Sequence, residues 1–177
     1  MERTSRNESQ GRLWDARQFC TELAEKHYEN FPVGRWVRAD LKPHIHAIYA
    51  FARTADDFAD EAEHEGARLE RLSLWRTLLM EATAGEAEHP IFVALTDTIS
   101  KFEVPIDWLD RLIRAFEQDV KQNRHRSFES LLAYAENSAN PVGRLVLWLH
   151  GYRDEQLFEW SDAICSALQL ANFWQDV

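Results

Sequence analysis

Apolar residues recur at intervals of three and four along most of the chain, which is the spacing of one face of an α-helix. The clearest apolar stripe consists of Leu109, Leu112, Ile113, Phe116 and Val120. The polar residues of the same segment lie elsewhere: Asp110, Arg114, Gln118 and Lys121. Alternating patterns are scarce, and the 177 residues include only six glycines and five prolines. The sequence therefore predicts an all-α fold.

The spacing predicts about eight helices. We expect them at Leu13–His27, Pro43–Glu65, Leu69–Ala82, Pro90–Phe102, Asp107–Asn123, Phe128–Asn137, Val142–His150 and from Asp154 onward. Pro43, Pro90 and Pro105 stand where helices can begin, and Ser127 is a plausible N-cap. Pro141 should break the helical pattern between Ser138 and Gly143. Such a break either frees carbonyls that line a cavity or simply joins two helices.

The polar residues 1–12 carry no apolar periodicity, and we expect a disordered tail there. Residues 13–177 are predicted to be the N-terminal portion of a single domain. The sequence ends in Asn-Phe-Trp-Gln-Asp-Val, inside a helical pattern and without a cap or glycine to close it. We therefore expect the C-terminal part of the domain to be missing.

Charge and cysteine content exclude several classes of function. Lys and Arg number 20 against 30 Asp and Glu, and the net charge of −10 argues against a nucleic-acid partner. Cys20 and Cys165 match neither a disulfide framework nor a zinc site. The N-terminus lacks the apolar core of a signal peptide, and no apolar run could cross a bilayer. We expect a cytoplasmic protein with at most weak peripheral membrane contact.

A polar stripe runs through the apolar segment AIYAFARTADDFADE. Tyr49, Arg53, Asp56 and Asp60 advance by four, three and four residues, which places them on one helical face. Asp56 and Asp60, one turn apart, can offer oxygens to the same hard cation, such as Mg²⁺. Two like charges at this spacing weaken a helix, so a compensating cation is suggested. The alternative reading of such a pair is a solvated helix face.

The last predicted helix repeats this geometry. Cys165, Gln169, Asn172 and Asp176 also advance by four, three and four residues among apolar neighbours. Two such rows facing each other, together with a diphosphate, would complete the shell of a magnesium ion. Asn and Asp near the end of a chain also commonly do no more than face water.

AIYAFARTADDFADE resembles the first aspartate-rich motif of the squalene/phytoene synthase family, and LQLANFWQDV resembles the start of the second. The resemblance extends from Phe19 to Val177. It implies an isoprenoid-synthase-type helical bundle around a central cavity. It also implies Mg²⁺ as the cofactor and a prenyl diphosphate, presqualene or farnesyl diphosphate, as the substrate.

Site residues carry over by position within these motifs. The resemblance implies that Asp56, Asp60, Asn172 and Asp176 hold the metal. Substrate binding would fall to His27, Asn30, Arg53, Gln169 and Asn172. The catalytic set would comprise Asp56, Asp60, Arg53 and Tyr49.

Two further segments, HYENFP and SANPVGRLVL, most resemble the bacterial branch of the family that makes hydroxysqualene for hopanoids. This branch implies ionisation of presqualene diphosphate and capture of the rearranged cation by water. A companion synthase would act before it and a reductase after it. Gln175 and Glu136 replace an arginine and a tyrosine common in the family, and both argue against plain squalene synthesis. Condensation of two farnesyl or geranylgeranyl diphosphates and a non-catalytic scaffold role remain alternatives.

Overall fold

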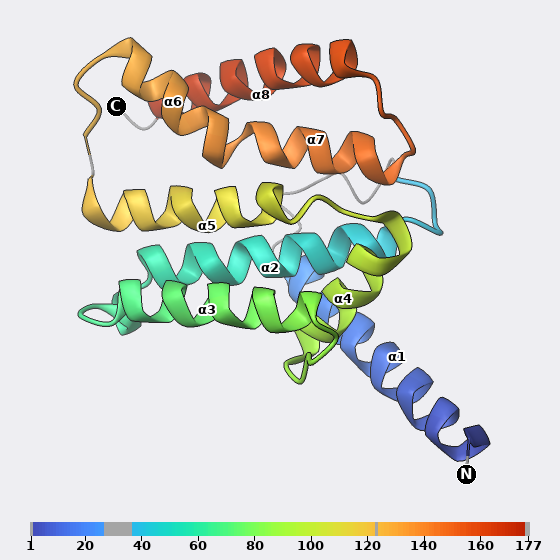
Figure 1. The fold of residues 1–177 in the computed structure, drawn as a ribbon. Coiled ribbons are helices and arrows are strands. Elements are labelled where there is room, and N and C mark those ends of the chain that lie inside the picture. Colours follow the sequence, from blue (N-terminus) through green and yellow to red (C-terminus); the bar gives the residue numbers. More distant parts are fainter. Residues whose placement is uncertain (1, 27–36, 123, 176–177) are drawn as a thin grey trace. The chain divides into compact units, whose positions relative to one another are not determined.

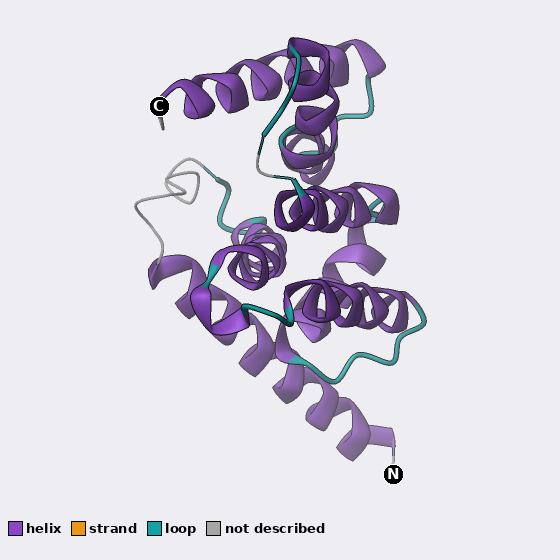
Figure 2. Cartoon of the chain, turned by 90° about the vertical axis from the view of Figure 1, so that its left-hand side faces the viewer, coloured by secondary structure: helices purple, strands orange, loops and turns teal. Residues whose placement is uncertain are grey.

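The computed structural model describes residues 2–26, 37–122 and 124–175, and within these ranges it forms eight α-helices and one 3₁₀ turn (Figure 1). The elements are α1 (Glu2–Lys26), α2 (Lys42–Asp60), η3 (Ala62–His64), α3 (Arg68–Thr83), α4 (Pro90–Phe102), α5 (Ile106–Lys121), α6 (Phe128–Ser138), α7 (Asn140–Leu149) and α8 (Glu155–Gln175). Loops join the helices (Figure 2). The all-α prediction is confirmed, and each expected helix appears, with the largest differences from the predicted bounds in α1 and α2.

The N-terminal helix is longer than predicted. Residues 2–12, expected as a disordered tail, belong to α1. Once a helix is nucleated, each added turn costs little, so a polar segment can extend a helix whose later turns are buried. Ala16 and Cys20 supply that burial, and the Arg12 guanidinium donates a hydrogen bond of 2.9 Å to the carbonyl of Ala87.

The second helix is shorter than predicted. It ends at Asp60, not at Glu65, because Glu61 adopts an extended conformation before the turn η3. The chain then reverses at Gly66, whose φ of +85° lies in the region that glycine tolerates best. The ring of His64 packs edge-on against Phe58 at 5.1 Å, which holds this turn against the end of α2.

The chain divides into two compact units, residues 1–54 with 74–103 and residues 55–73 with 104–177. The core of the first unit is aromatic. The Phe51 ring stacks on Trp75 at 6.0 Å, and Phe92 meets Trp75 at 4.5 Å. The indole nitrogen of Trp75 also donates to the Phe51 carbonyl at 3.2 Å. Burial of each such side chain contributes roughly 1.5–3 kcal/mol.

Buried polar groups of the first unit are paired with one another. His44 is 2% exposed, and its Nδ1 lies 3.0 Å from the Thr98 hydroxyl. Its Nε2 lies 3.2 Å from the Lys101 ammonium. Burial, assisted by the charge of Lys101, lowers the His44 pKa to about 4. An ion pair of 2.6 Å between Arg17 and Asp97 ties α1 to α4.

The second unit contains α5, α6, α7 and α8, with α7 and α8 side by side (Figure 1). Its core includes the predicted apolar stripe of α5, of which Leu109, Leu112 and Ile113 are buried. Asp110 departs from prediction, because it is only 8% exposed. An ion pair of 2.5 Å with Arg114 compensates its charge.

The predicted break at Pro141 is present. Helix α6 ends at Ser138, and α7 begins at Asn140 with Pro141 in its first turn, where the missing amide hydrogen costs nothing. Only Ala139 separates the two helices. The predicted cap Ser127 is confirmed, since its hydroxyl accepts from the Ser130 amide in a reciprocal capping box.

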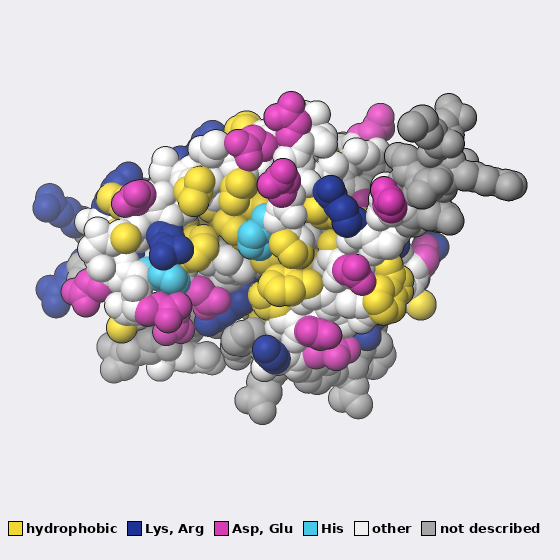
Figure 3. Space-filling view, turned by 90° about the horizontal axis from the view of Figure 1, so that it is seen from below, with side chains coloured by type: hydrophobic (Ala, Val, Ile, Leu, Met, Phe, Trp, Pro, Cys, Tyr) yellow, Lys and Arg dark blue, Asp and Glu magenta, His cyan; other side chains and the backbone are white. Residues whose placement is uncertain are grey.

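The face drawn in Figure 3 carries acidic and basic side chains dispersed around a central group of apolar ones.

In the described ranges, none of the helices combines the length and apolar content that crossing a lipid bilayer requires.

Helices α7 and α8 approach each other closely at Gly143. A Cβ atom built there would lie 2.6 Å from the Sγ of Cys165 and closer still to the Oγ of Ser161, both on α8. The absence of a side chain is thus what allows α7 and α8 to approach. By contrast, a Cβ built at Gly11 on α1 meets nothing within 4 Å.

Gly143→Ala should therefore destabilise the protein by about 1–3 kcal/mol, because Ser161 and Cys165 must leave their rotamers or the helices must separate. Gly11→Ala is the matched control and should stabilise the protein by ~0.5–1 kcal/mol through helix propensity alone. Urea denaturation of both variants measures the two effects. Equal midpoints for the two variants would contradict this account of the α7/α8 contact.

Candidate functional site

The two aspartates of the first polar stripe lie in the last two turns of α2, within the second unit. Asp56 is half-buried and Asp60 is exposed. Ala55 and Ala59, which directly precede the two aspartates on the helix, are buried. Small apolar residues therefore anchor this part of α2 beside the two carboxylates.

A third carboxyl group, that of Asp119 on α5, lies in the electrostatic field of Asp56 and Asp60. Burial is the main cause that raises the pKa of Asp119 from 3.8 to about 6, and the negative charges of Asp60 and Asp56 add to it. The hydrogen bond from Tyr134 acts in the opposite direction. Near neutral pH, three negative groups therefore share one region.

The hydrogen-bond partner of Asp119 is a buried phenol. The Tyr134 hydroxyl donates to Oδ2 of Asp119 at 2.8 Å, and Tyr134 is 7% exposed. Burial first, and then the negative charge of Asp119, raises the Tyr134 pKa. The phenol therefore stays protonated and acts as a donor at physiological pH.

The second polar row lies in the same unit, on α8. Gln169 is half-buried and Asn172 is exposed. The next residue, Phe173, packs against the Tyr134 ring at 5.7 Å. The structure thus brings α8 into contact with the hydrogen-bond partner of Asp119. That Asn172 faces Asp56 and Asp60 stays a prediction.

The structure says less about the other predicted site residues. Tyr49 and Arg53 lie half-buried on the part of α2 that belongs to the first unit. His27, Asn30 and Asp176 lie outside the described residues. Their roles stay predictions.

The chemistry of the donors fits a hard divalent cation, since Asp56, Asp60 and Asp119 offer oxygens that repel one another. Within the described part of the chain, however, no three Asp, Glu, His or Cys side chains are arranged to hold a metal ion. These donors thus fit part of a magnesium shell, and further oxygens must come from elsewhere.

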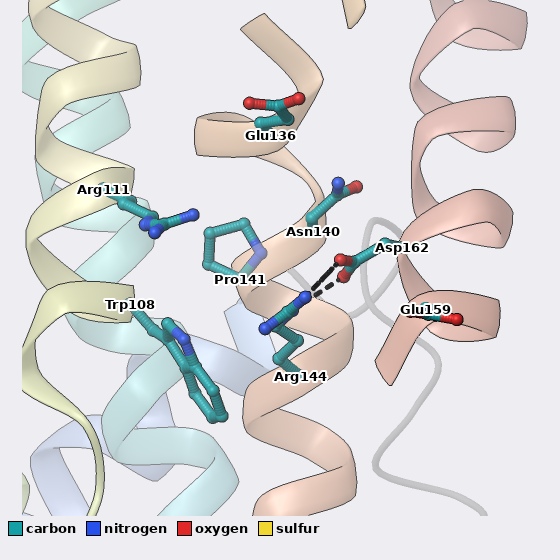
Figure 4. A pocket seen from close by; sticks show the side chains of 8 residues that line it. All are labelled: Trp108, Arg111, Glu136, Asn140, Pro141, Arg144, Glu159 and Asp162. Atoms are coloured by element: carbon teal, nitrogen blue, oxygen red, sulfur yellow. Dashed lines mark hydrogen bonds and ion pairs between the residues drawn. The ribbon is translucent and has the colours of Figure 1, made fainter. Parts of the chain in front are cut away.

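A separate pocket of about 400 Å³ opens between α5, α7 and α8 (Figure 4). Its lining includes the ion pair of Arg144 with Asp162, whose shortest contact is 2.6 Å. The remaining lining residues are Trp108, Arg111, Glu136, Asn140, Pro141 and Glu159. Because none of the three carboxylates lines it, this pocket and the candidate site are distinct.

Sequence reasoning missed Asp119, although a signal was present. It follows Leu112 by seven residues and Phe116 by three, so it continues the apolar stripe of α5. A carboxylate at a core-facing position is rarely buried without a partner. The bond of Asp119 to Tyr134 joins two helices and leaves no local pattern in the sequence.

The comparisons with known proteins agree with the predicted family. The squalene/phytoene synthase family model matches residues 25–177. Hydroxysqualene synthase of Zymomonas mobilis is 36% identical over 84% of this chain, and that of Rhodopseudomonas palustris is 37% identical over 84%. In each case the chain spans 50% of the relative's length.

A solved structure supports the same assignment. The crystal structure of squalene synthase HpnC from Alicyclobacillus acidocaldarius matches 93% of this chain and 62% of its own, with a TM-score of 0.87 and 41% identity. The all-helical architecture of this chain is therefore that of an isoprenoid synthase. Fold and sequence agree: the chain belongs to the squalene/phytoene synthase family.

Proposed function

We propose that this chain acts in a magnesium-dependent enzyme that ionises presqualene diphosphate and captures the rearranged cation with water to give hydroxysqualene. The observation that carries the proposal is the grouping of Asp56, Asp60 and Asp119 in one region. The 36–37% identity to two hydroxysqualene synthases supports this branch of the family. A reductase acting on the alcohol would then give squalene.

Asp56 and Asp60 would hold magnesium, with Asn172 and Asp176 contributing from α8. When bound, the metal would stabilise negative charge on the departing diphosphate. Arg53, His27, Asn30 and Gln169 are proposed to bind the substrate, and Tyr49 to lie beside the reacting carbons. The carbon–oxygen bond breaks with its electron pair leaving on the diphosphate.

Tyr134 and Asp119 supply a proton-handling pair. The phenol stays protonated and donates to Oδ2 of Asp119, which leaves the second carboxylate oxygen available. With a pKa of about 6, Asp119 is a base matched to neutral pH, and it can take the proton that water releases on forming the new carbon–oxygen bond. The products are then an alcohol, diphosphate and one proton.

The second candidate is condensation of two allylic diphosphates. It is favoured by the 28% identity to phytoene synthase of Arthrospira platensis over 92% of this chain. Farnesyl or geranylgeranyl diphosphate would then be the substrate, and the same carboxylates would serve. A non-catalytic scaffold is the outcome if no diphosphate reacts.

The protein with presqualene diphosphate and Mg²⁺ should release hydroxysqualene, identified by mass spectrometry. Asp60→Asn should lower kcat/KM at least ~100-fold, because one charge at the leaving-group site is lost. Glu70→Gln, at an exposed position in the first turn of α3, should leave kcat/KM unchanged. Consumption of farnesyl diphosphate with presqualene diphosphate untouched would establish the condensing reaction instead.

Stability should depend on pH through Asp119. Its folded pKa is raised, so folding favours the protonated form; the stability is full below pH 3.8 and falls as the pH rises through about 6. Relative to Asp119→Asn, the protein should lose about 1–2 kcal/mol across this window, a value reduced by solvent screening. Denaturation midpoints measured between pH 4 and about 7 give the difference.

Magnesium should reduce this loss in the unaltered protein, because a cation offsets the repulsion among the carboxylates. In Asp60→Asn, the same concentration should have a smaller effect. This measurement reports metal binding without enzyme activity. A pH dependence that magnesium leaves unchanged would count against the carboxylate site.

A further inference from the structure

Three aromatic rings from different elements meet beside the Tyr134–Asp119 pair. His125 lies in the connection between α5 and α6, Tyr134 on α6, and Phe173 on α8. The His125 ring is 5.1 Å from Tyr134 and 5.6 Å from Phe173, and the latter two rings are 5.7 Å apart. The phenol ring is therefore in contact with a ring from each of two other elements.

These contacts restrict Tyr134 at both ends. Its hydroxyl is fixed by the 2.8 Å bond to Asp119, and its ring is fixed by tilted and edge-on packing. Because Phe173 directly follows Asn172, the same cluster joins the proton-handling pair to the helix that carries the second polar row. Orientation of the phenol thus depends on residues outside its own helix.

A histidine at position 125 lowers the stability of the folded protein. The Nδ1 atom of His125 is shielded from solvent and has no hydrogen-bond partner among the described residues. The buried histidines of the first unit differ in this respect, since Nδ1 of His44 pairs with Thr98 and Nδ1 of His46 pairs with Thr21. Phenylalanine would give the same ring contacts without burying an unpaired nitrogen. Buried polar groups without a hydrogen-bond partner are uncommon in native proteins, and a role in function is one explanation for them.

We infer that His125 is a positioning residue for the Tyr134–Asp119 pair: its ring holds the phenol against Asp119, and its Nδ1 serves as a hydrogen-bonding group for the reaction at that pair. The inference rests on the proposed function for the role of the nitrogen. The role of the ring stands on the geometry alone.

The role of the ring is tested in the full chain without any substrate. NMR of ring-labelled tyrosine, with the Tyr134 signal assigned by its loss in Tyr134→Phe, gives the flip rate of this ring. His125→Ala should speed the flip at least tenfold, whereas His125→Phe should leave it within twofold. An unchanged flip rate in His125→Ala would overturn the positioning role, whether or not any diphosphate reacts.

The role of the nitrogen is tested by activity together with stability. His125→Phe should raise the denaturation midpoint, because the unpaired nitrogen is gone, yet lower kcat at least tenfold with KM within twofold. His125→Asn places a polar atom near the position of Nδ1 and should recover most of kcat, whereas His125→Gln, which mimics Nε2, should not. Wild-type kcat in His125→Phe would overturn the role of the nitrogen.

A purely structural role would give a different pattern. His125→Phe, His125→Asn and His125→Gln would then lose activity only in proportion to lost stability, and that result would also overturn the inference. If the unaltered protein consumes neither presqualene nor farnesyl diphosphate, the proposed function fails. The flip rate of Tyr134 still decides the positioning role in that case.

Discussion

Three carboxyl groups of the second unit, those of Asp56 and Asp60 on α2 and of Asp119 on α5, repel one another. Burial and the charges of Asp56 and Asp60 together keep the pKa of Asp119 well above its usual value. Such a grouping opposes folding, and burial of apolar residues on the same helices, Ala55 and Ala59 on α2 and Leu112 on α5, contributes stability in the opposite direction. Binding of a cation or of a proton would relieve this repulsion, and the proposed reaction involves both.

The Arg144–Asp162 pair shows how the same unit treats a charge that is only structural. Nε and Nη2 of Arg144 both donate to the carboxylate of Asp162, and this bond is the main cause that raises the Arg144 pKa. In such an ion pair the two charges balance each other, so no additional ligand is required. The hydrogen-bond partner of Asp119 is instead a neutral phenol, which lowers the pKa of the carboxyl group without neutralising its charge. Under the proposed function, this difference separates a group placed for stability from one placed for reaction.

Local patterns predicted the fold well because helices are local structures. The stripe of α5, the Ser127 cap and the break at Pro141 each follow from residues close in sequence. The helical residues 2–12 were missed, and there Arg12 bonds to the carbonyl of Ala87, 75 residues away. The burial of Asp110 was missed because its place in the packed unit is not written in the local pattern. Asp119 belongs with them, because the α2 carboxylates that raise its pKa are about sixty residues away in sequence. Residue spacing predicted the row of Asp56 and Asp60 on α2, but it could not predict that Asp119 of α5 lies in their electrostatic field.

The position of Glu136 bears on which reaction this branch performs. A tyrosine common in the family is replaced there by a carboxylate, two residues after Tyr134, which is more than half a turn around α6. Tyr134 contacts Asp119, whereas Glu136 lines the separate pocket with Arg111 and Asn140 (Figure 4). The replacement therefore adds its charge on the side of α6 away from the three carboxylates. If Glu136 influences the choice between water capture and condensation, it does so from the separate pocket and not by contact with the three carboxylates.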